Sequence, residues 1–300
     1  MVRVCPYTSR DVHLAYQQMG DPTSPAVLLV HGLASQALWW DEGFCQKFLD
    51  AGYQVIRFDN REHGLSTKMD GLPQPPVWKP LVLPRRLCPE GPYPLKALAE
   101  DAVALIDVLG IEKAHFVGSS MGGMIVQLIA IHFPQRIASM HILCSMSGNR
   151  SIPDPPLWAR LRILKSPKSQ SDEDILSYYV SQEETLFQYR VKNFDRDWAA
   201  DRYALLHKRA PVYHSGSYRC LYALLHAQSR DGDLATLSKV PTLVVAGATD
   251  VVINPLNAYH MAGLIPGAKL LILPDMSHSI VPQHSNTIAS AALEVMTRAM

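Results

Sequence analysis

The chain has 300 residues, of which 48% are hydrophobic and 18% are charged. This length is sufficient for one large globular domain that carries an inserted subdomain. The formal net charge is only +1, so no excess of positive charge favours nucleic acid or an anionic membrane as a partner. These properties direct the search for function to a local site.

The sequence also predicts where the protein resides. Its first residues, Met1 to Thr8, contain no apolar stretch of the kind that a signal peptide needs. No segment approaches the roughly 18 consecutive apolar residues of a membrane helix. The five cysteines are scattered and form no C-x-x-C pair, which argues against a disulfide framework or a zinc site. We therefore expect a cytoplasmic protein without a membrane span, and its oligomeric state stays open.

Short apolar runs alternate along the chain with longer segments of helical periodicity. Strands are expected at residues 13–18, 26–30, 53–59, 114–118, 137–144, 242–246 and 269–273, and helices at residues 37–50, 95–109, 121–132, 255–264 and from about Thr287. This alternation is typical of an α/β fold in which helices flank a mostly parallel central sheet.

Two stretches interrupt the alternation. Residues 70–94 contain eight prolines, a density that excludes a helix or a central strand, so we expect a long loop inserted within the core. Residues 147–235 show several segments of helical periodicity and no clear pair of strands. We expect them to form a helical cap above the carboxyl edge of the sheet, where open α/β sheets bind ligands. The core domain would then comprise residues 1–146 and 236–300.

The main chemical signal is Gly118-Ser119-Ser120-Met121-Gly122. A G-x-S-x-G pattern arises by chance in roughly one chain in ten, so its context decides its meaning. Here an apolar strand precedes the pattern and an apolar helix follows it. This is the context of a nucleophile elbow, where glycines leave room around a strained serine. The alternative is a glycine-rich turn without chemistry, and we predict instead that Ser120 is a catalytic nucleophile.

A serine hydroxyl needs a base, and the chain order expected on this fold is serine, acid, histidine. Asp250 follows the predicted strand 242–246, and His278 follows the predicted strand 269–273, so both should lie on the same sheet edge as Ser120. His278 would accept the serine proton, while Asp250 would fix the tautomer of the imidazole and stabilise its charged form. The weighed alternatives are His284 for the base and, for the acid, Asp231, Asp233 and Asp275.

An oxyanion hole needs preorganised donors, here two backbone N–H groups. The N–H group of Met121, directly after the nucleophile, would supply one. The loop His31-Gly32-Leu33-Ala34 after the strand 26–30 would supply the other, and Leu33 is the preferred donor. The alternative is that His31-Gly32 only ends a strand.

Residues near the predicted site suggest an apolar substrate pocket. Trp39, Met124 and Met146 are the candidates for its wall, together with aromatic residues of the cap. No H-E-x-x-H motif, P-loop or G-x-G-x-x-G is present, so no metal site is predicted. The basic residues at the start of the cap are interpreted as a solvated helix face: Arg160, Arg162, Lys165 and Lys168.

These motifs together resemble the α/β-hydrolase superfamily from near residue 10 to the C-terminus. They are His31-Gly32, the segment Asp59 to Thr67, the Gly118–Gly122 elbow, Asp250 and His278. The segment Asp59 to Thr67 looks like the Asp-x-Arg-x-x-Gly-x-Ser element of the cofactor-free esterase branch. With Leu264 to Ala268, the combination is similar to the aclacinomycin methylesterases.

The resemblance implies carboxylic-ester hydrolysis of a small-molecule substrate, a cap over the site, and no metal or organic cofactor. It also implies that Arg61 and His63 are turn and packing residues and not catalysts. A serine at position 120 argues against the relatives that use a carboxylate nucleophile. The proline-rich insertion 70–94 departs from the pattern of the close relatives, which leaves the identity of the substrate open.

Three functional hypotheses follow. The preferred one is ester hydrolysis through an acyl-enzyme on Ser120. The second keeps the same triad but changes the reaction to lactone opening, carbon–carbon bond hydrolysis or a lyase step, because contacts with the cap select the substrate. The third is a non-catalytic ligand-binding protein on a hydrolase scaffold.

Overall fold

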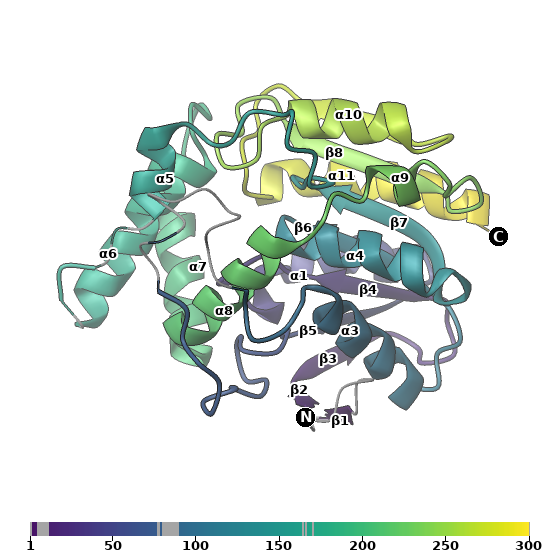
Figure 1. Cartoon of the computed structure of the whole chain (residues 1–300), viewed down its shortest axis with the longest axis horizontal. Helices are drawn as coiled ribbons and strands as arrows, with labels where there is room; N and C mark the ends of the chain where they lie inside the picture. Colours follow the sequence, from purple (N-terminus) through teal and green to yellow (C-terminus); the bar gives the residue numbers. More distant parts are fainter. Residues whose placement is uncertain are drawn as a thin grey trace.

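A twisted seven-stranded sheet forms the centre of the molecule (Figure 1). The computed structural model describes residues 2–4, 12–76, 79, 90–163, 165, 167–169 and 171–299. The strand order is β3-β5-β4-β6-β7-β8-β9, and only the pair β3–β5 is antiparallel. The predicted α/β class with a mostly parallel sheet is therefore confirmed.

The strand bounds agree closely with the predicted apolar runs. The sheet strands are β3 (Tyr16–Met19), β4 (Ala26–Val30), β5 (Gln54–Phe58), β6 (Ala114–Ser119), β7 (Ile137–Leu143), β8 (Thr242–Gly247) and β9 (Lys269–Leu273). The prediction of one strand over residues 13–18 was wrong in one respect. This segment forms two strands that are separated at Ala15, because β2 (Val12–Leu14) pairs with β1 (Val2–Val4) and β3 pairs with β5.

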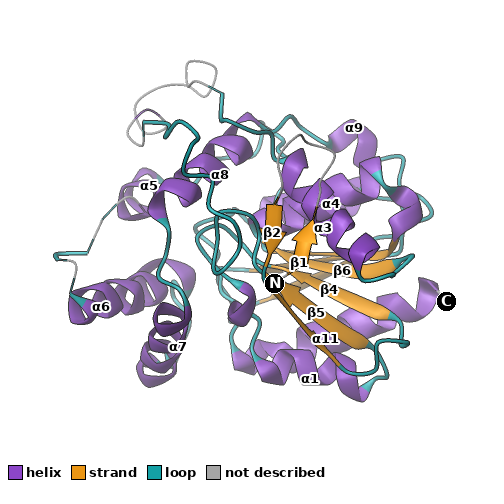
Figure 2. Cartoon of the chain, turned by 90° about the horizontal axis from the view of Figure 1, so that it is seen from below, coloured by secondary structure: helices purple, strands orange, loops and turns teal. Residues whose placement is uncertain are grey.

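Helices cover both faces of the sheet, as Figure 2 shows along its edge. One layer contains α3 (Lys96–Val108), α4 (Met121–His132) and α10 (Leu256–Leu264), and the other contains α1 (Glu42–Asp50) and α11 (Pro282–Met296). The predicted helix 37–50 is interrupted, since Ala37–Trp39 is a short 3-10 helix and Asp41 then caps α1. Helix α11 starts at Pro282 and not near Thr287, because proline is well suited to a first helical turn.

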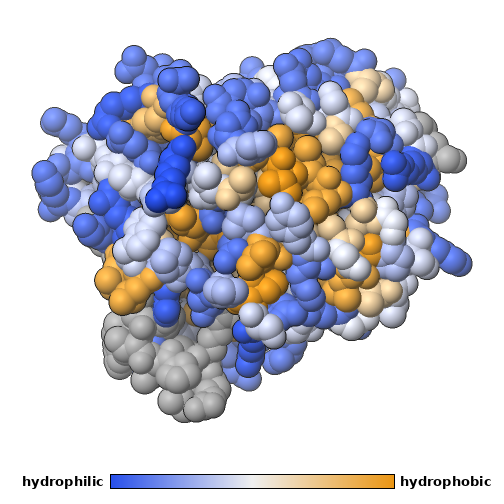
Figure 3. Space-filling view, turned by 90° about the horizontal axis from the view of Figure 1, so that it is seen from above, coloured by the Kyte–Doolittle hydropathy of each residue, from blue (hydrophilic) through white to orange (hydrophobic). Residues whose placement is uncertain are grey.

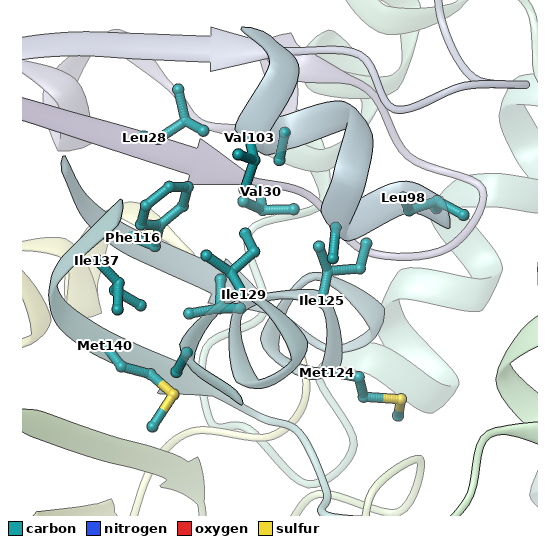
Figure 4. Packing of buried hydrophobic residues seen from close by; sticks show 14 of the residues in the cluster. Leu28, Val30, Leu98, Val103, Phe116, Met124, Ile125, Ile129, Ile137 and Met140 are labelled. Atoms are coloured by element: carbon teal, nitrogen blue, oxygen red, sulfur yellow. The ribbon is translucent and has the colours of Figure 1, made fainter. Parts of the chain in front are cut away.

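The sheet and the layer of α3 and α4 enclose the larger of two apolar clusters (Figure 4). Leu28 and Phe116 project from neighbouring strands, and Ile125 and Ile129 of α4 lie against them. All four side chains are fully buried. At roughly 1.5–3 kcal/mol for each such side chain, this packing holds α4 firmly against β4 and β6.

The chain between β7 and β8 forms a group of helices at one end of the molecule (Figure 1). They are α5 (Leu157–Ile163), α6 (Asp172–Gln182), a π-helical turn (Glu183–Phe187), α7 (Arg196–Arg209) and α8 (His214–His226). The chain then returns to the core through the short α9 (Asp231–Leu234), which lies beside α4 and α10. We refer to residues 147–235 as the helical insertion. Strands are absent from its described part.

Two ion pairs, each with a buried carboxylate, attach the insertion to the segment that follows β5. Arg209 of α7 contacts Asp59 at 2.8 Å, and Arg219 of α8 contacts Glu62 at 2.6 Å. Both carboxylates are fully buried, so each depends on its arginine for charge compensation. The segment Asp59–Gly64, which carries part of the family resemblance, is therefore the platform on which α7 and α8 rest.

The two ends of the insertion are bonded to each other at what we call the neck. The Arg230 N–H donates to the Ser147 carbonyl at 3.0 Å. The Asp231 carboxylate accepts hydrogen bonds from Ser147 Oγ at 2.5 Å and from Asn149 Nδ2 at 2.7 Å. It also contacts His260 Nε2 of α10 at 2.9 Å. The neck thus fastens the first and last segments of the insertion to one helix of the core.

Most of the proline-rich loop 70–94 cannot be compared with its prediction. Residues 77, 78 and 80–89 lie outside the described residues. In the described part, Asp70 accepts a hydrogen bond from the Tyr213 hydroxyl, and the Pro76 carbonyl accepts one from Tyr222 at 2.5 Å. This loop therefore contacts the start and the middle of α8.

Candidate active site

Ser120 lies at a sharp turn between β6 and α4, and its backbone is strained. Its φ is 54° and its ψ is −118°, a conformation that favours glycine over any residue with a side chain. The turn is tight enough to require its flanking glycines. A Cβ on Gly118 would lie 2.3 Å from the Gly122 carbonyl oxygen, and one on Gly122 would lie 2.1 Å from the Val30 carbonyl oxygen.

The turn directs Ser120 into a cavity and is fixed by hydrogen bonds. The Ser120 N–H donates to the Leu143 carbonyl at 2.9 Å, and the Ser120 carbonyl accepts from Ser145 Oγ at 2.7 Å. Ser120 lines the cavity, and the N-terminus of α4 begins at the next residue. The first N–H groups of a helix lack intrahelical acceptors and carry partial positive charge, so they can stabilise an anion here.

Asp250 and His278 meet at the ends of β8 and β9. His278 Nδ1 lies 2.7 Å from Asp250 Oδ2, and both residues are buried. Asp250 Oδ1 accepts the N–H groups of Val252 and Ile253, each at 2.8 Å. A carboxylate that accepts three hydrogen bonds is fixed in orientation. It therefore selects the tautomer in which His278 Nδ1 carries the proton and Nε2 is free to accept one.

His278 and Ser120 line the same cavity, so the structure brings all three predicted catalytic residues to one edge of the sheet. The alternatives lie elsewhere. His284 is on α11 and contacts the exposed Asp275 at 3.5 Å. Asp231 is engaged in the neck.

The loop after β4 runs against the elbow. A Cβ on Gly32 would lie 3.2 Å from the Ser120 Cβ, and Leu33 lines the cavity beside Ser120. Met121 is fully buried, and its backbone forms the first position of α4. Of the two predicted oxyanion donors, Leu33 therefore lies in the loop that packs against the elbow, and Met121 directly follows the candidate nucleophile.

Two buried histidines hold this loop in place. The Asn60 N–H donates to His31 Nε2 at 3.0 Å, and the Ala34 N–H donates to His63 Nε2 at 3.1 Å. Burial lowers the pKa of His31 to about 3 and also lowers the pKa of His63, so both rings are neutral acceptors near neutral pH. His63 thus supports the loop, and Arg61 forms a buried ion pair with Asp101 at 2.5 Å.

The cavity has a volume of about 1000 Å³ and lies between the sheet edge and the helical insertion. Trp39, Met124 and Met146 line it, as do aromatic residues of the insertion, Tyr178, Tyr179, Tyr203 and Phe187. Its wall is not wholly apolar, because Asn149 and Gln182 also line it. A cavity of this size can hold a multi-ring molecule that carries a few polar groups.

The prediction of a solvated face for the basic residues at the start of the insertion was wrong for the two that lie on α5. Arg160 lines the cavity, and Arg162 donates to Gln182 Oε1 at 3.0 Å. Lys165 and Lys168 follow this helix and are exposed, and Lys165 also lines the cavity. The exposed side of α5 is apolar instead, since Leu157, Trp158 and Leu161 are among the exposed large hydrophobic residues. Figure 3 shows apolar side chains reaching the surface in several places on one face of the molecule.

Sequence reasoning missed three residues that surround His278. The Cys144 Sγ lies within 4.8 Å of the ligand atoms of Asp250 and His278, and burial raises the pKa of its thiol well above the ordinary value. Phe187 and Glu183 approach from the π-helical turn. No local motif marks these residues, because they come from distant segments that only the folded chain brings together.

Comparisons with known proteins agree with this architecture. A family model described as "alpha/beta hydrolase fold" matches residues 25–285. Rhodomycin D methylesterase of Streptomyces peucetius is 26% identical, and 3-oxoadipate enol-lactonase 2 of Acinetobacter baylyi is 27% identical. The alignments cover 97% of this chain in both cases, and 97% and 96% of the relatives.

A solved meta-cleavage product hydrolase of Pseudomonas fluorescens has the same fold, with a TM-score of 0.74 at 17% identity over 100% of this chain and 98% of that one. None of the helices in the described part of the chain has the length and apolar content that crossing a bilayer requires. The predicted resemblance is thus confirmed at the level of the family and its methylesterase relatives. The chain belongs to the α/β-hydrolase fold family.

Proposed function

We propose that this protein is a serine hydrolase that cleaves carboxylic esters of small, mainly apolar molecules. Ser120 is the nucleophile, His278 the general base and acid, and Asp250 the residue that orients the imidazole. The observation that carries the proposal is the 2.7 Å contact between His278 and the buried Asp250 in the cavity that also contains the strained Ser120.

The reaction proceeds in two steps, acylation of Ser120 and hydrolysis of the acyl-enzyme. His278 Nε2 accepts the Ser120 proton while Oγ attacks the ester carbonyl carbon, and the N–H groups of Leu33 and Met121 bind the resulting oxyanion. The intermediate collapses, and the alcohol leaves with the proton from His278. Water then attacks the acyl-enzyme with His278 as base, which releases the acid and restores Ser120.

The helical insertion acts as a cap that selects the substrate. It contributes the aromatic wall described above, while Trp39, Met124 and Met146 complete the pocket from the core. The core would comprise residues 1–146 and 236–300, with 70–94 as a loop within it. Relatives with methylesterase activity favour a methyl ester as the cleaved group.

A labelling experiment with a matched control tests the nucleophile. An organophosphonate should add one covalent group to the wild-type protein, located on Ser120 by peptide mass spectrometry. Ser119→Ala, in the same elbow, should still be labelled, whereas Ser120→Ala should lose both labelling and hydrolysis of a methyl-ester panel. Retained esterase activity in Ser120→Ala would refute the proposal.

Lactone opening is a second candidate, because an enol-lactonase is 27% identical over nearly the whole chain. The same triad would open a lactone, but the alcohol would remain part of the product. Rates on a methyl ester and on a lactone of equal carbon number decide between the two. Faster turnover of the lactone, by tenfold or more, would replace the ester assignment.

A further inference from the structure

The loop that carries His278 is held by the helical insertion and not only by the core. The N–H groups of His278 and Ser279 both donate to the Phe187 carbonyl, at 2.8 and 2.9 Å. The Ser277 hydroxyl donates to the Leu186 carbonyl at 3.4 Å. Three successive residues of this loop, which we call the histidine loop, are therefore bonded to the π-helical turn Glu183–Phe187. Such turns are often found at functional positions.

The same turn contains a buried acid that the triad does not explain. Glu183 is fully buried, and its carboxyl accepts hydrogen bonds from Gln188 Nε2 at 2.9 Å and from the Tyr203 hydroxyl at 2.8 Å. The Ser279 hydroxyl, one residue after His278, also bonds to it. Burying a carboxylate is unfavourable unless donors satisfy it, so this set of three donors is a built environment for a negative charge.

The charges around His278 can be assigned among the described residues. Asp250, Cys144 and Glu183 are the acidic groups that face it, from β8, β7 and the insertion, and Tyr203 lies on the other side of Glu183. Burial raises the pKa values of Cys144 and Tyr203 well above their ordinary range, so both stay neutral. Asp250 and Glu183 are thus the carboxyl groups that the imidazole encounters.

We propose that Glu183 is a positioning residue for His278: through Ser279 and the π-helical turn it fixes the histidine loop, and its carboxylate stabilises the imidazolium that forms during turnover. The inference rests on the proposed function of His278 as general base. Burial raises the pKa of Glu183, whereas the bonds from Ser279, Gln188 and Tyr203 and the charge of His278 oppose this shift and favour the carboxylate.

The test compares two neighbouring glutamates. Glu183→Gln should lower kcat about tenfold with little change in KM, and the acid limb of the kcat/KM profile should move about half a unit or more to lower pH, because the imidazolium loses an anion. Glu184→Gln is the control, since Glu184 is half-exposed and pairs with Arg196 at the surface. It should leave kcat and the acid limb unchanged.

A second readout does not depend on turnover. The imidazole of His278 is titrated by NMR in a Ser120→Ala background, with and without Glu183→Gln, and its signal is assigned from His278→Gln. The titration midpoint should shift in the same direction as the acid limb. An unchanged midpoint together with an unchanged acid limb would overturn the role of Glu183. If the wild-type protein hydrolyses no ester, the proposed function fails, and the NMR midpoint still decides the role of Glu183.

The conservative variant separates positioning from folding. Glu183→Asp keeps the charge on a shorter side chain, so the acid limb should stay near that of the wild type while kcat falls. If Glu183→Gln does not fold, this variant decides: a lower kcat with an unchanged acid limb supports the positioning role, and an unchanged kcat overturns it.

Discussion

The backbone of Ser120 is strained at the centre of the candidate site. Its φ of 54° with ψ of −118° suits glycine, and such conformations are disfavoured by about 1–3 kcal/mol for other residues. Surrounding bonds from Leu143 and Ser145 hold the residue there. The strain has a role in presenting Oγ, so it should be measurable when the hydroxyl is removed.

We predict that the free energy of unfolding of Ser120→Gly is about 1 kcal/mol higher than that of Ser120→Ala, although both variants lose activity. Glycine relieves the strain, whereas alanine keeps it. Urea unfolding of the two variants measures the difference. A lower stability for the glycine variant would show that the elbow is not strained.

Asp250→Asn tests how His278 is oriented. The amide oxygen can still accept from Val252 and Ile253, which turns the NH2 group toward His278 Nδ1. Nδ1 must then be an acceptor, so Nε2 carries the proton and cannot take one from Ser120. We expect kcat to fall by roughly 10³–10⁴ while the circular dichroism spectrum is unchanged. A loss of less than tenfold would exclude Asp250 as the orienting acid.

At the scale of elements, the attachment of α8 depends on one buried ion pair. Arg219 and Glu62 lie 2.6 Å apart and are almost completely buried. Removing one partner leaves the other charge uncompensated, which costs about 3–5 kcal/mol in comparable pairs.

We therefore expect Arg219→Met to lower the free energy of unfolding by about this amount. The free energy of unfolding of the double variant Glu62→Gln, Arg219→Met should fall by clearly less than the sum of the decreases in the two single variants. Thermal or urea unfolding of all four proteins completes the cycle. Strict additivity would mean that the pair does not couple α8 to the core.

Elements differ in how well sequence alone could predict them. The elbow and the ends of β8 and β9 were predictable because their signals are local: an apolar strand is followed within five residues by Ser120, Asp250 or His278. The contacts of Glu183 with the histidine loop and of Arg219 with Glu62 were not. Charged residues in a helical segment suggest a solvated face, and their burial depends on packing between segments about a hundred residues apart.

At the scale of the whole molecule, several histidines are buried in the neutral state. Burial lowers the pKa values of His31 and His141 to about 3 and that of His115 to about 4. In the unfolded chain these rings titrate near 6.5, so below that pH the unfolded state binds protons that the native state does not. The contribution of these neutral rings to the free energy of unfolding is therefore fully present above about pH 6.5. It decreases as the pH falls from there toward the pKa values of the rings in the native state.

Each of these histidines should reduce the free energy of unfolding by about 1.4 kcal/mol per pH unit below 6.5. Urea unfolding at pH 7.5, 6 and 5 measures the slope in a range where few carboxylates titrate. His141→Gln should make the slope shallower by the contribution of one group. A free energy of unfolding that does not change between pH 7.5 and 5 would contradict the neutral burial of these rings.

The neck and the π-helical turn together limit how this enzyme can be diversified. The neck joins the two ends of the helical insertion at Ser147, Arg230 and Asp231, so the insertion could be exchanged between relatives as one unit. However, the insertion also carries the Phe187 carbonyl that holds the loop of His278. A chimera grafted at the neck would acquire a new cavity wall and lose a support of the loop that carries the proposed base. In the proposed mechanism, substrate selectivity and catalytic power would therefore be inherited together.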